Sequence, residues 1–247
     1  MHPLRQFARG LVDVVFPPIC VHCRGVVEQP GPEPDFRFIC RQCAAQLDWV
    51  HAPHCVTCGH PFFGIVAGER MCPHCDGLDP AFREGHTAVL FKGPARSLVI
   101  ELKYHRGLHV LSDIRQIFRR APHVMERARG SVLVPVPLHP RKARERGFNQ
   151  AQLLAECLAF AAGADTTVQP LLRRTVDTVS QTTFDRRTRL ANLKNAFALA
   201  RGANLNPAIN YILVDDVFTT GSTLNSCARA LRRAGAVTVD VITFGHG

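Results

Sequence analysis

Eight of the ten cysteines stand in four Cys-x-x-Cys pairs within the first 75 residues. Two thiolates at this spacing can point at one ion across a tight turn, and two such pairs complete a tetrahedral zinc site with four cysteine ligands. Gly25, Gly59 and Gly77 follow three of the pairs and suit tight turns. We therefore expect two structural zinc ions; sequential pairing is simplest, and interleaved pairing stays open. The expected ligands are Cys20, Cys23, Cys40, Cys43, Cys55, Cys58, Cys72 and Cys75.

A disulfide scaffold is the alternative explanation of the cysteines, but it requires an oxidising compartment. Asp13, Pro17 and Pro18 interrupt the most apolar N-terminal run, which argues against a secretory signal and leaves no stretch long enough to span a bilayer. We therefore expect a cytoplasmic protein with no membrane span. Histidines also lie among the cysteines, but four complete pairs make a histidine ligand unnecessary at any of them: His22, His54, His60 and His74.

A second group of reactive side chains follows an apolar segment near the C-terminus. Residues 211–214 predict a buried strand, and Asp215 and Asp216 come at its C-terminal end, where open α/β sheets bind ligands. The hydroxyls and N–H groups of Thr219–Thr223 then open a predicted helix, which Ser222 or Thr223 would cap, and this is a ready anion site. Carboxylates beside such a site would repel a bare phosphate, so they must serve ribose hydroxyls or Mg²⁺. Neither a Walker loop nor a dinucleotide fingerprint matches.

The strand, the acidic pair and the Thr-Thr-Gly-Ser loop resemble the signature of the type I phosphoribosyltransferases. The resemblance implies that Asp215 and Asp216 hold the ribose hydroxyls of phosphoribosyl pyrophosphate, with Mg²⁺ as its cofactor. It also implies which residues hold the 5′-phosphate: Thr219, Thr220, Gly221, Ser222 and Thr223.

Nearly the whole chain resembles the ComF/GntX family, whose members are associated with natural transformation or DNA utilisation. That resemblance implies a zinc-ribbon module joined to a domain of the type I phosphoribosyltransferase fold. Besides the cysteine module, the residues that carry it are Leu102–Gly107, Val134–Pro140, Arg146–Gln150, Arg174, Thr175, Gln181, Arg186, Arg187 and Asn192.

Two basic segments complete what the resemblance implies about the donor. The loop that carries Arg141, Lys142, Arg144 and Arg146 is similar to the pyrophosphate loop, although a solvated charge run would look the same. The polar segment 173–189 is similar to a flexible hood loop, in which Arg186 and Arg187 would contact pyrophosphate during transfer. Lys103 joins the donor site on family grounds. No residue stands out as a general base.

Two functions are compatible with these residues. The first is a Mg²⁺-dependent phosphoribosyltransferase whose acceptor is unknown. The second is a non-catalytic module that senses a phosphoribosyl ligand and holds single-stranded DNA for the DNA-uptake machinery. Its support is the charge distribution, because residues 81–247 hold 24 basic and 12 acidic side chains, whereas residues 1–80 hold 6 and 8.

The same asymmetry of charge and cysteine content predicts two domains, a ribbon module at 1–80 and a phosphoribosyltransferase-like domain at 81–247. Alternating strands and helices in the second predict an α/β fold with a mostly parallel sheet flanked by helices. Expected strands are 86–92, 131–136, 168–172, 195–199, 211–214 and 237–244. Expected helices are 3–15, 95–105, 108–128, 148–162 and 222–234, with a basic loop at 137–147.

Overall fold

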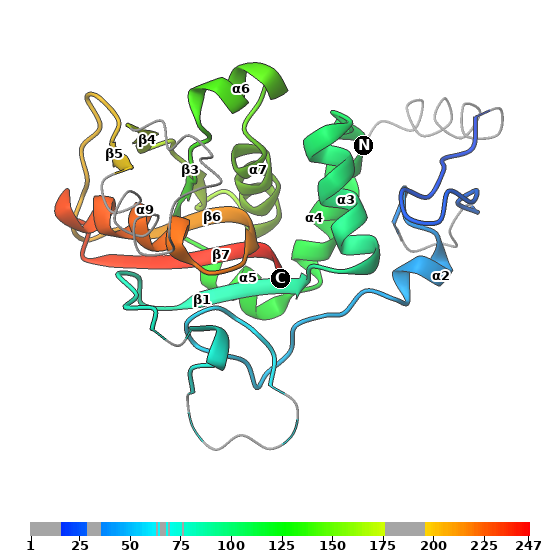
Figure 1. Ribbon diagram of the computed structural model, residues 1–247, viewed down its shortest axis with the longest axis horizontal. Coiled ribbons are helices and arrows are strands. Elements are labelled where there is room, and N and C mark those ends of the chain that lie inside the picture. The colour runs from blue at the N-terminus through cyan, green and yellow to red at the C-terminus, as the bar shows by residue number, and fades with distance from the viewer. Residues whose placement is uncertain are drawn as a thin grey trace, which may run out of the picture.

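The computed structural model describes residues 16–28, 36–62, 64, 68, 70–75, 77–175 and 196–247 (Figure 1). The predicted helix at 3–15 and most of the predicted hood loop lie outside the described residues. No helix in the described part of the chain is both long and apolar enough to cross a membrane.

A five-stranded parallel sheet forms the centre of the described part, in the order β1-β7-β6-β2-β3. Its two longest strands, β6 and β7, lie in the middle and are apolar along most of their length, as expected for strands covered on both faces. This confirms the predicted α/β class with a mostly parallel sheet. The strands are β1 (Gly85–Leu90), β2 (Val132–Pro135), β3 (Thr167–Val168), β6 (Asn210–Phe218) and β7 (Thr238–His246).

Helices cover both faces of this sheet (Figure 1), and alternate residues of β6 pack into the two hydrophobic cores on its opposite faces. Ile212 and Val214 join the core with α3, α4, α5 and α7, whereas Tyr211 and Leu213 join the core with α9. The helices are α3 (Gly93–Tyr104), α4 (Leu111–Arg119), α5 (Pro122–Ala128), α6 (Pro140–Arg146), α7 (Gln150–Ala162) and α9 (Ser222–Arg233), with a short 3-10 turn, η2 (Leu108–Val110), before α4.

The first cysteine unit packs on the α3–α4 side of the sheet and contains the short helix α2 (Arg41–Ala44). The buried carboxylate of Asp113 on α4 accepts the backbone N–H groups of Arg37 and Phe38 at 2.9 and 2.7 Å. Burial raises the pKa of Asp113, and these N–H groups oppose the rise. A buried carboxylate therefore fastens the first unit to the α/β part.

The second cysteine unit packs on the other side and contains the 3-10 turn η1 (Pro73–Cys75). Residues after it reach α9, because Asn225 donates to the Asp79 carbonyl at 2.7 Å and accepts the N–H of Ala81 at 2.7 Å. Each unit is thus attached to one face of the sheet.

Three predicted elements differ in kind or in number from those in the structure. Pro170 interrupts the predicted strand 168–172, which becomes β3 and the separate β4 (Leu172–Arg174); β4 pairs antiparallel with β5 (Phe197–Leu199). The predicted basic loop contains α6, which starts with Pro140 behind a His139 cap and ends at Gly147 with φ +84°. The predicted helical stretch 108–128 consists of η2, α4 and α5, with Pro122 opening α5.

Candidate functional site

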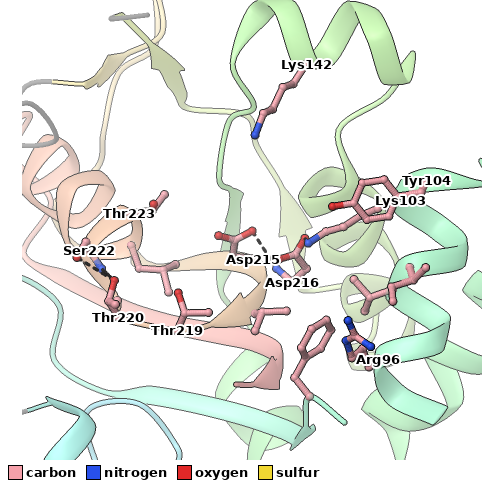
Figure 2. Close-up of a pocket in the computed structure, with 16 residues that line it drawn as sticks. Arg96, Lys103, Tyr104, Lys142, Asp215, Asp216, Thr219, Thr220, Ser222 and Thr223 are labelled. Atoms are coloured by element: carbon pink, nitrogen blue, oxygen red, sulfur yellow. Dashed lines mark hydrogen bonds and ion pairs between the residues drawn. The ribbon is translucent and has the colours of Figure 1, made fainter. Parts of the chain in front are cut away.

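The two aspartates lie inside β6 and not after it, because the strand runs on to Phe218 beside β7. Neighbouring residues of a strand point to opposite faces, so the two carboxylates take different surroundings. Asp216 faces α3 and α7, where its Oδ2 lies 2.5 Å from Lys103 Nζ and accepts from Gln150 Nε2 at 3.1 Å. Asp215 Oδ1 accepts the N–H of Asp216 at 2.9 Å (Figure 2).

The two carboxyl groups therefore lie in different electrostatic surroundings. Burial, and next to it the charge of Asp216, raises the pKa of Asp215 to about 8, while the Asp216 N–H and Lys103 oppose the rise. Lys103 supplies Asp216 with a cationic partner. One carboxyl group is thus ion-paired, whereas the other has a raised pKa, which a bound cation would lower.

The loop after β6 curls around the start of α9 as the sequence predicts, but its cap differs. Gly221 is the N-cap at φ +68°, with no side-chain cap, so neither Ser222 nor Thr223 takes that position. A Cβ on Gly221 would meet the ring of buried Phe218 at 2.6 Å, so only glycine fits there. Thr220 Oγ1 instead lies 3.0 Å from Ser222 Oγ and accepts the Ser222 N–H at 3.4 Å.

The acidic pair and this loop line one pocket of about 630 Å³, within the usual range of small-molecule sites (Figure 2). The first N–H groups of α9 have no partner within the helix and carry its positive dipole end towards the loop. One side of the pocket thus suits an anion and the other suits hydroxyls or a cation. The lining residues are Phe91, Arg96, Val99, Ile100, Lys103, Tyr104, Lys142, Asp215, Asp216, Val217, Thr219, Thr220, Gly221, Ser222, Thr223 and Leu224.

The cysteines form two separate groups of four, which confirms sequential pairing: Cys20, Cys23, Cys40 and Cys43, then Cys55, Cys58, Cys72 and Cys75. Zinc–sulfur bonds of about 2.3 Å in a tetrahedron place the sulfurs about 3.8 Å apart. The Sγ–Sγ distances of 3.7 Å (Cys23–Cys40), 3.5 Å (Cys58–Cys72) and 3.9 Å (Cys55–Cys75) match that spacing. Both groups therefore fit zinc without a histidine ligand.

Comparison with known proteins agrees with these features. Residues 11–76 match the family described as the double zinc ribbon domain. The DNA utilization protein YhgH of Salmonella typhi is 31% identical over 218 residues, which cover 82% of this chain and 94% of that protein. This chain belongs to the ComF family.

Other members are similar over comparable lengths. Competence protein F of Haemophilus influenzae is 28% identical, covering 90% of this chain and 94% of that protein, and competence protein ComFC of Bacillus subtilis is 26% identical, covering 80% and 79%. Among solved structures, a hypoxanthine phosphoribosyltransferase from Staphylococcus aureus aligns with a TM-score of 0.34 and 12% identity over 54% of this chain and 62% of that chain.

The basic residues expected to hold pyrophosphate take different positions in this ComF-family chain. Lys142 reaches from α6 towards the acidic pair (Figure 2), whereas Arg141 pairs with Glu145 at 2.8 Å and Arg144 is exposed without lining the pocket. Arg146 donates to Gln150 Oε1, and Gln150 in turn donates to Asp216, so Arg146 contacts the acidic pair only indirectly. Arg186 and Arg187 lie outside the described residues.

Several lining residues were not singled out from the sequence. Arg96 and Ile100 lie two turns and one turn before Tyr104 on α3 and face the same pocket. Their spacing of four residues is the signal that indicates a common face, but it does not say what that face covers. Gln150 supports the site from outside the pocket lining, and the sequence indicated it only as part of the family motif. Its hydrogen bond to Asp216 joins residues that are 66 positions apart in the chain.

Proposed function

We propose that this ComF-family chain binds phosphoribosyl pyrophosphate with Mg²⁺ and transfers the phosphoribosyl group to an acceptor. The observation that carries the proposal is the single pocket that Asp215, Asp216 and the loop Thr219–Thr223 line together. We also propose the division into a ribbon module at 1–80 and a phosphoribosyltransferase-like domain at 81–247. The resemblance of the β6–α9 segment to the type I phosphoribosyltransferases supports both.

Each side of the pocket then has a role. The loop N–H groups and the hydroxyls of Thr219, Thr220 and Thr223 bind the 5′-phosphate, while Asp215 and Asp216 bind the ribose hydroxyls. Carboxylate oxygens are also the hard donors that Mg²⁺ prefers, and bound Mg²⁺ would neutralise charge on the pyrophosphate. Lys142, Arg141, Arg144 and Arg146 are the proposed cationic surroundings of the pyrophosphate, together with Arg186 and Arg187.

The reaction needs positioning and charge more than covalent help. The C1–O bond of the donor breaks and pyrophosphate leaves with the bonding electron pair. The lone pair of the acceptor forms the new bond at C1, and the acceptor's proton passes to solvent. Lys103 forms an ion pair with Asp216. This ion pair must break when Asp216 binds ribose or a cation, and the Lys103 ammonium group can then contact the leaving pyrophosphate.

Calorimetric titration of phosphoribosyl pyrophosphate with Mg²⁺ into the zinc-loaded protein tests the donor site. We expect binding that disappears in the Asp215→Asn, Asp216→Asn double variant and persists in Asp165→Asn, an exposed aspartate outside the pocket. Thermal melting checks that the double variant is folded. Absence of binding to the parent protein, or equal binding to the double variant, would refute the donor site. If the donor binds, release of pyrophosphate in the presence of an acceptor distinguishes an enzyme from a sensor.

We propose single-stranded DNA binding as a second function, which the names of the DNA-utilisation relatives support. The specific observation is Phe160 on α7, 64% exposed, with the guanidinium carbons of Arg115 and Arg119 at 4.1 and 5.8 Å from its ring centroid. Exposed aromatic rings among arginines are typical of single-strand binding. Affinity for a labelled oligothymidylate should fall steeply with salt and about tenfold in Phe160→Ala; salt-independent binding would exclude this surface.

A further inference from the structure

The α3 side of the pocket is lined by a single stripe of the helix. Arg96, Val99, Ile100, Lys103 and Tyr104 recur at spacings of three and four residues, so they share one face (Figure 2). Lys103 is engaged with Asp216. The roles proposed for the donor site use no other residue of the stripe.

The chemistry of this stripe differs from that of the opposite side. Tyr104 is 71% exposed although it is aromatic, and Ile100 and Phe91 are partly exposed. Arg146 lies with its guanidinium carbon 5.8 Å from the Tyr104 ring centroid, which favours a fixed ring position. An apolar, aromatic surface beside a polar pocket is suited to the flat face of an unsaturated ring.

Arg96 adds a polar group at the other end of the stripe. It is exposed, and no carboxylate among the described residues pairs with it. A guanidinium presents a planar set of donors that matches carbonyl or carboxylate oxygens. Eight residues of helix separate Arg96 from Tyr104, about 12 Å along the axis at 1.5 Å per residue, so a fused ring stacked near Tyr104 can turn one edge towards Arg96.

We propose that this stripe, Phe91, Arg96, Ile100 and Tyr104, is the acceptor subsite, and that the acceptor is a planar heteroaromatic ring with a carbonyl or carboxylate edge. The inference rests on the proposed phosphoribosyl transfer. A ring nitrogen of the acceptor forms the bond to C1 as the C1–O bond breaks; pyrophosphate takes the bonding pair, and the nitrogen's proton passes to solvent. Tyr104 stacks on the ring and Arg96 donates to its oxygen edge.

Three probes separate the two sides of the pocket. Ribose 5-phosphate fills the phosphate and ribose side alone, whereas inosine 5′-monophosphate adds a fused ring with a carbonyl, and adenosine 5′-monophosphate carries an amino group in its place. We expect calorimetry with Mg²⁺ to show inosine 5′-monophosphate binding about tenfold more tightly than ribose 5-phosphate, because stacking of a base on an aromatic side chain has that order of effect.

The variants then assign the effect to the stripe. Tyr104→Ala should remove the tenfold gain and leave ribose 5-phosphate binding unchanged, and Tyr104→Phe should restore the gain. Inosine 5′-monophosphate should also bind more tightly than adenosine 5′-monophosphate, because only its carbonyl accepts from Arg96. Arg96→Gln should abolish this preference. Matched controls outside the pocket are Phe16→Ala, an aromatic residue that is 75% exposed, and Arg201→Gln, also exposed.

The outcomes distinguish the two proposals. If ribose 5-phosphate binds but the nucleotides bind no more tightly, or if Tyr104→Ala weakens all three probes equally, the acceptor subsite is wrong and the donor site stands. If neither ribose 5-phosphate nor the donor binds, the proposed function itself fails, and the inference fails with it.

Discussion

Two adjacent aspartates with different partners are the main feature of the pocket at the scale of single residues. Asp216 is held by Lys103 and Gln150, and Gln150 is held in turn by Arg146. Asp215 forms no ion pair of its own within the described residues, and burial with the charge of Asp216 raises its pKa. The two identical side chains therefore have different partners, and a carboxyl group with a raised pKa beside a paired one is typical of functional sites.

This difference predicts a pH dependence of donor binding. Because the pKa of Asp215 is raised to about 8 in the free protein, a ligand that brings a cation must expel its proton. Affinity for Mg²⁺ with phosphoribosyl pyrophosphate should therefore fall about tenfold per pH unit below pH 8 and level off above it. Groups facing Asp215 that also affect this titration are Asp216, Lys103 and Cys227.

Calorimetry in buffers of different ionisation enthalpy measures the proton released on binding. We expect nearly one proton released per donor bound at pH 7 and almost none at pH 9. Asp215→Asn has no proton to release, so whatever binding it retains should vary much less with pH. Equal proton release by Asp215→Asn and the parent protein would contradict the assignment.

At the scale of elements, the pocket lies between α3 and the loop that begins α9, and each of these is supported by one cysteine unit. The first unit contacts α3 through His22 Nδ1 and Ser97 Oγ at 2.9 Å, and α4 through Asp113. The second approaches the loop through Leu78, whose Cδ2 would lie 3.1 Å from a Cβ added to Gly221. The two cysteine units thus contact opposite walls of the pocket, the walls proposed to bind acceptor and donor.

Asp113→Ala tests the attachment of the first unit. It leaves two part-buried N–H groups, of Arg37 and Phe38, without their acceptor, which should lower the free energy of unfolding by about 2 kcal/mol. Ser112→Ala removes a hydroxyl that donates to the same carboxylate and keeps the backbone bonds, so it should cost much less. Urea unfolding measures both; equal effects would show that Asp113 does not fasten the unit.

The sequence predicted the elements whose signals are local. The cysteine spacing and the strand–aspartate–glycine pattern of residues 211–223 indicated the two metal groups and the loop. It did not predict α6, because the run of arginines looks solvated while the helix depends on its ends, His139 and Gly147. The predicted strand 211–214 also ended too early. Two adjacent aspartates are typical of a loop, and only the pairing with β7 extends the strand to Phe218. The pairing of Lys103 with Asp216 depends on packing between residues far apart in the chain and has no local signal.

At the scale of the whole molecule, the two zinc sites differ in how they are enclosed. All four cysteines of the second site are buried, whereas in the first site Cys23 is exposed and Cys40 is partly exposed. A structural zinc ion contributes directly to folding, and a chelator that removes it destabilises the fold. The more exposed of the two sites should therefore lose its zinc to a chelator first. The first ribbon, which contacts α3, is therefore the more vulnerable of the two.

Zinc release should follow this inequality. Protein purified without added metal should contain close to two zinc ions per chain by elemental analysis, and a chromogenic chelator should remove one ion much faster than the other. Cys23→Ser should lose the fast phase, retain about one zinc and keep the slow phase, because the buried second site is untouched. Cys58→Ser is the matched change in the second site and should remove the slow phase. It should lower the free energy of unfolding more than Cys23→Ser does, because the second site is buried in the core together with Phe82. A total below one zinc per chain, or release in a single phase that both variants alter equally, would show that the two groups of cysteines do not hold separate ions of different accessibility.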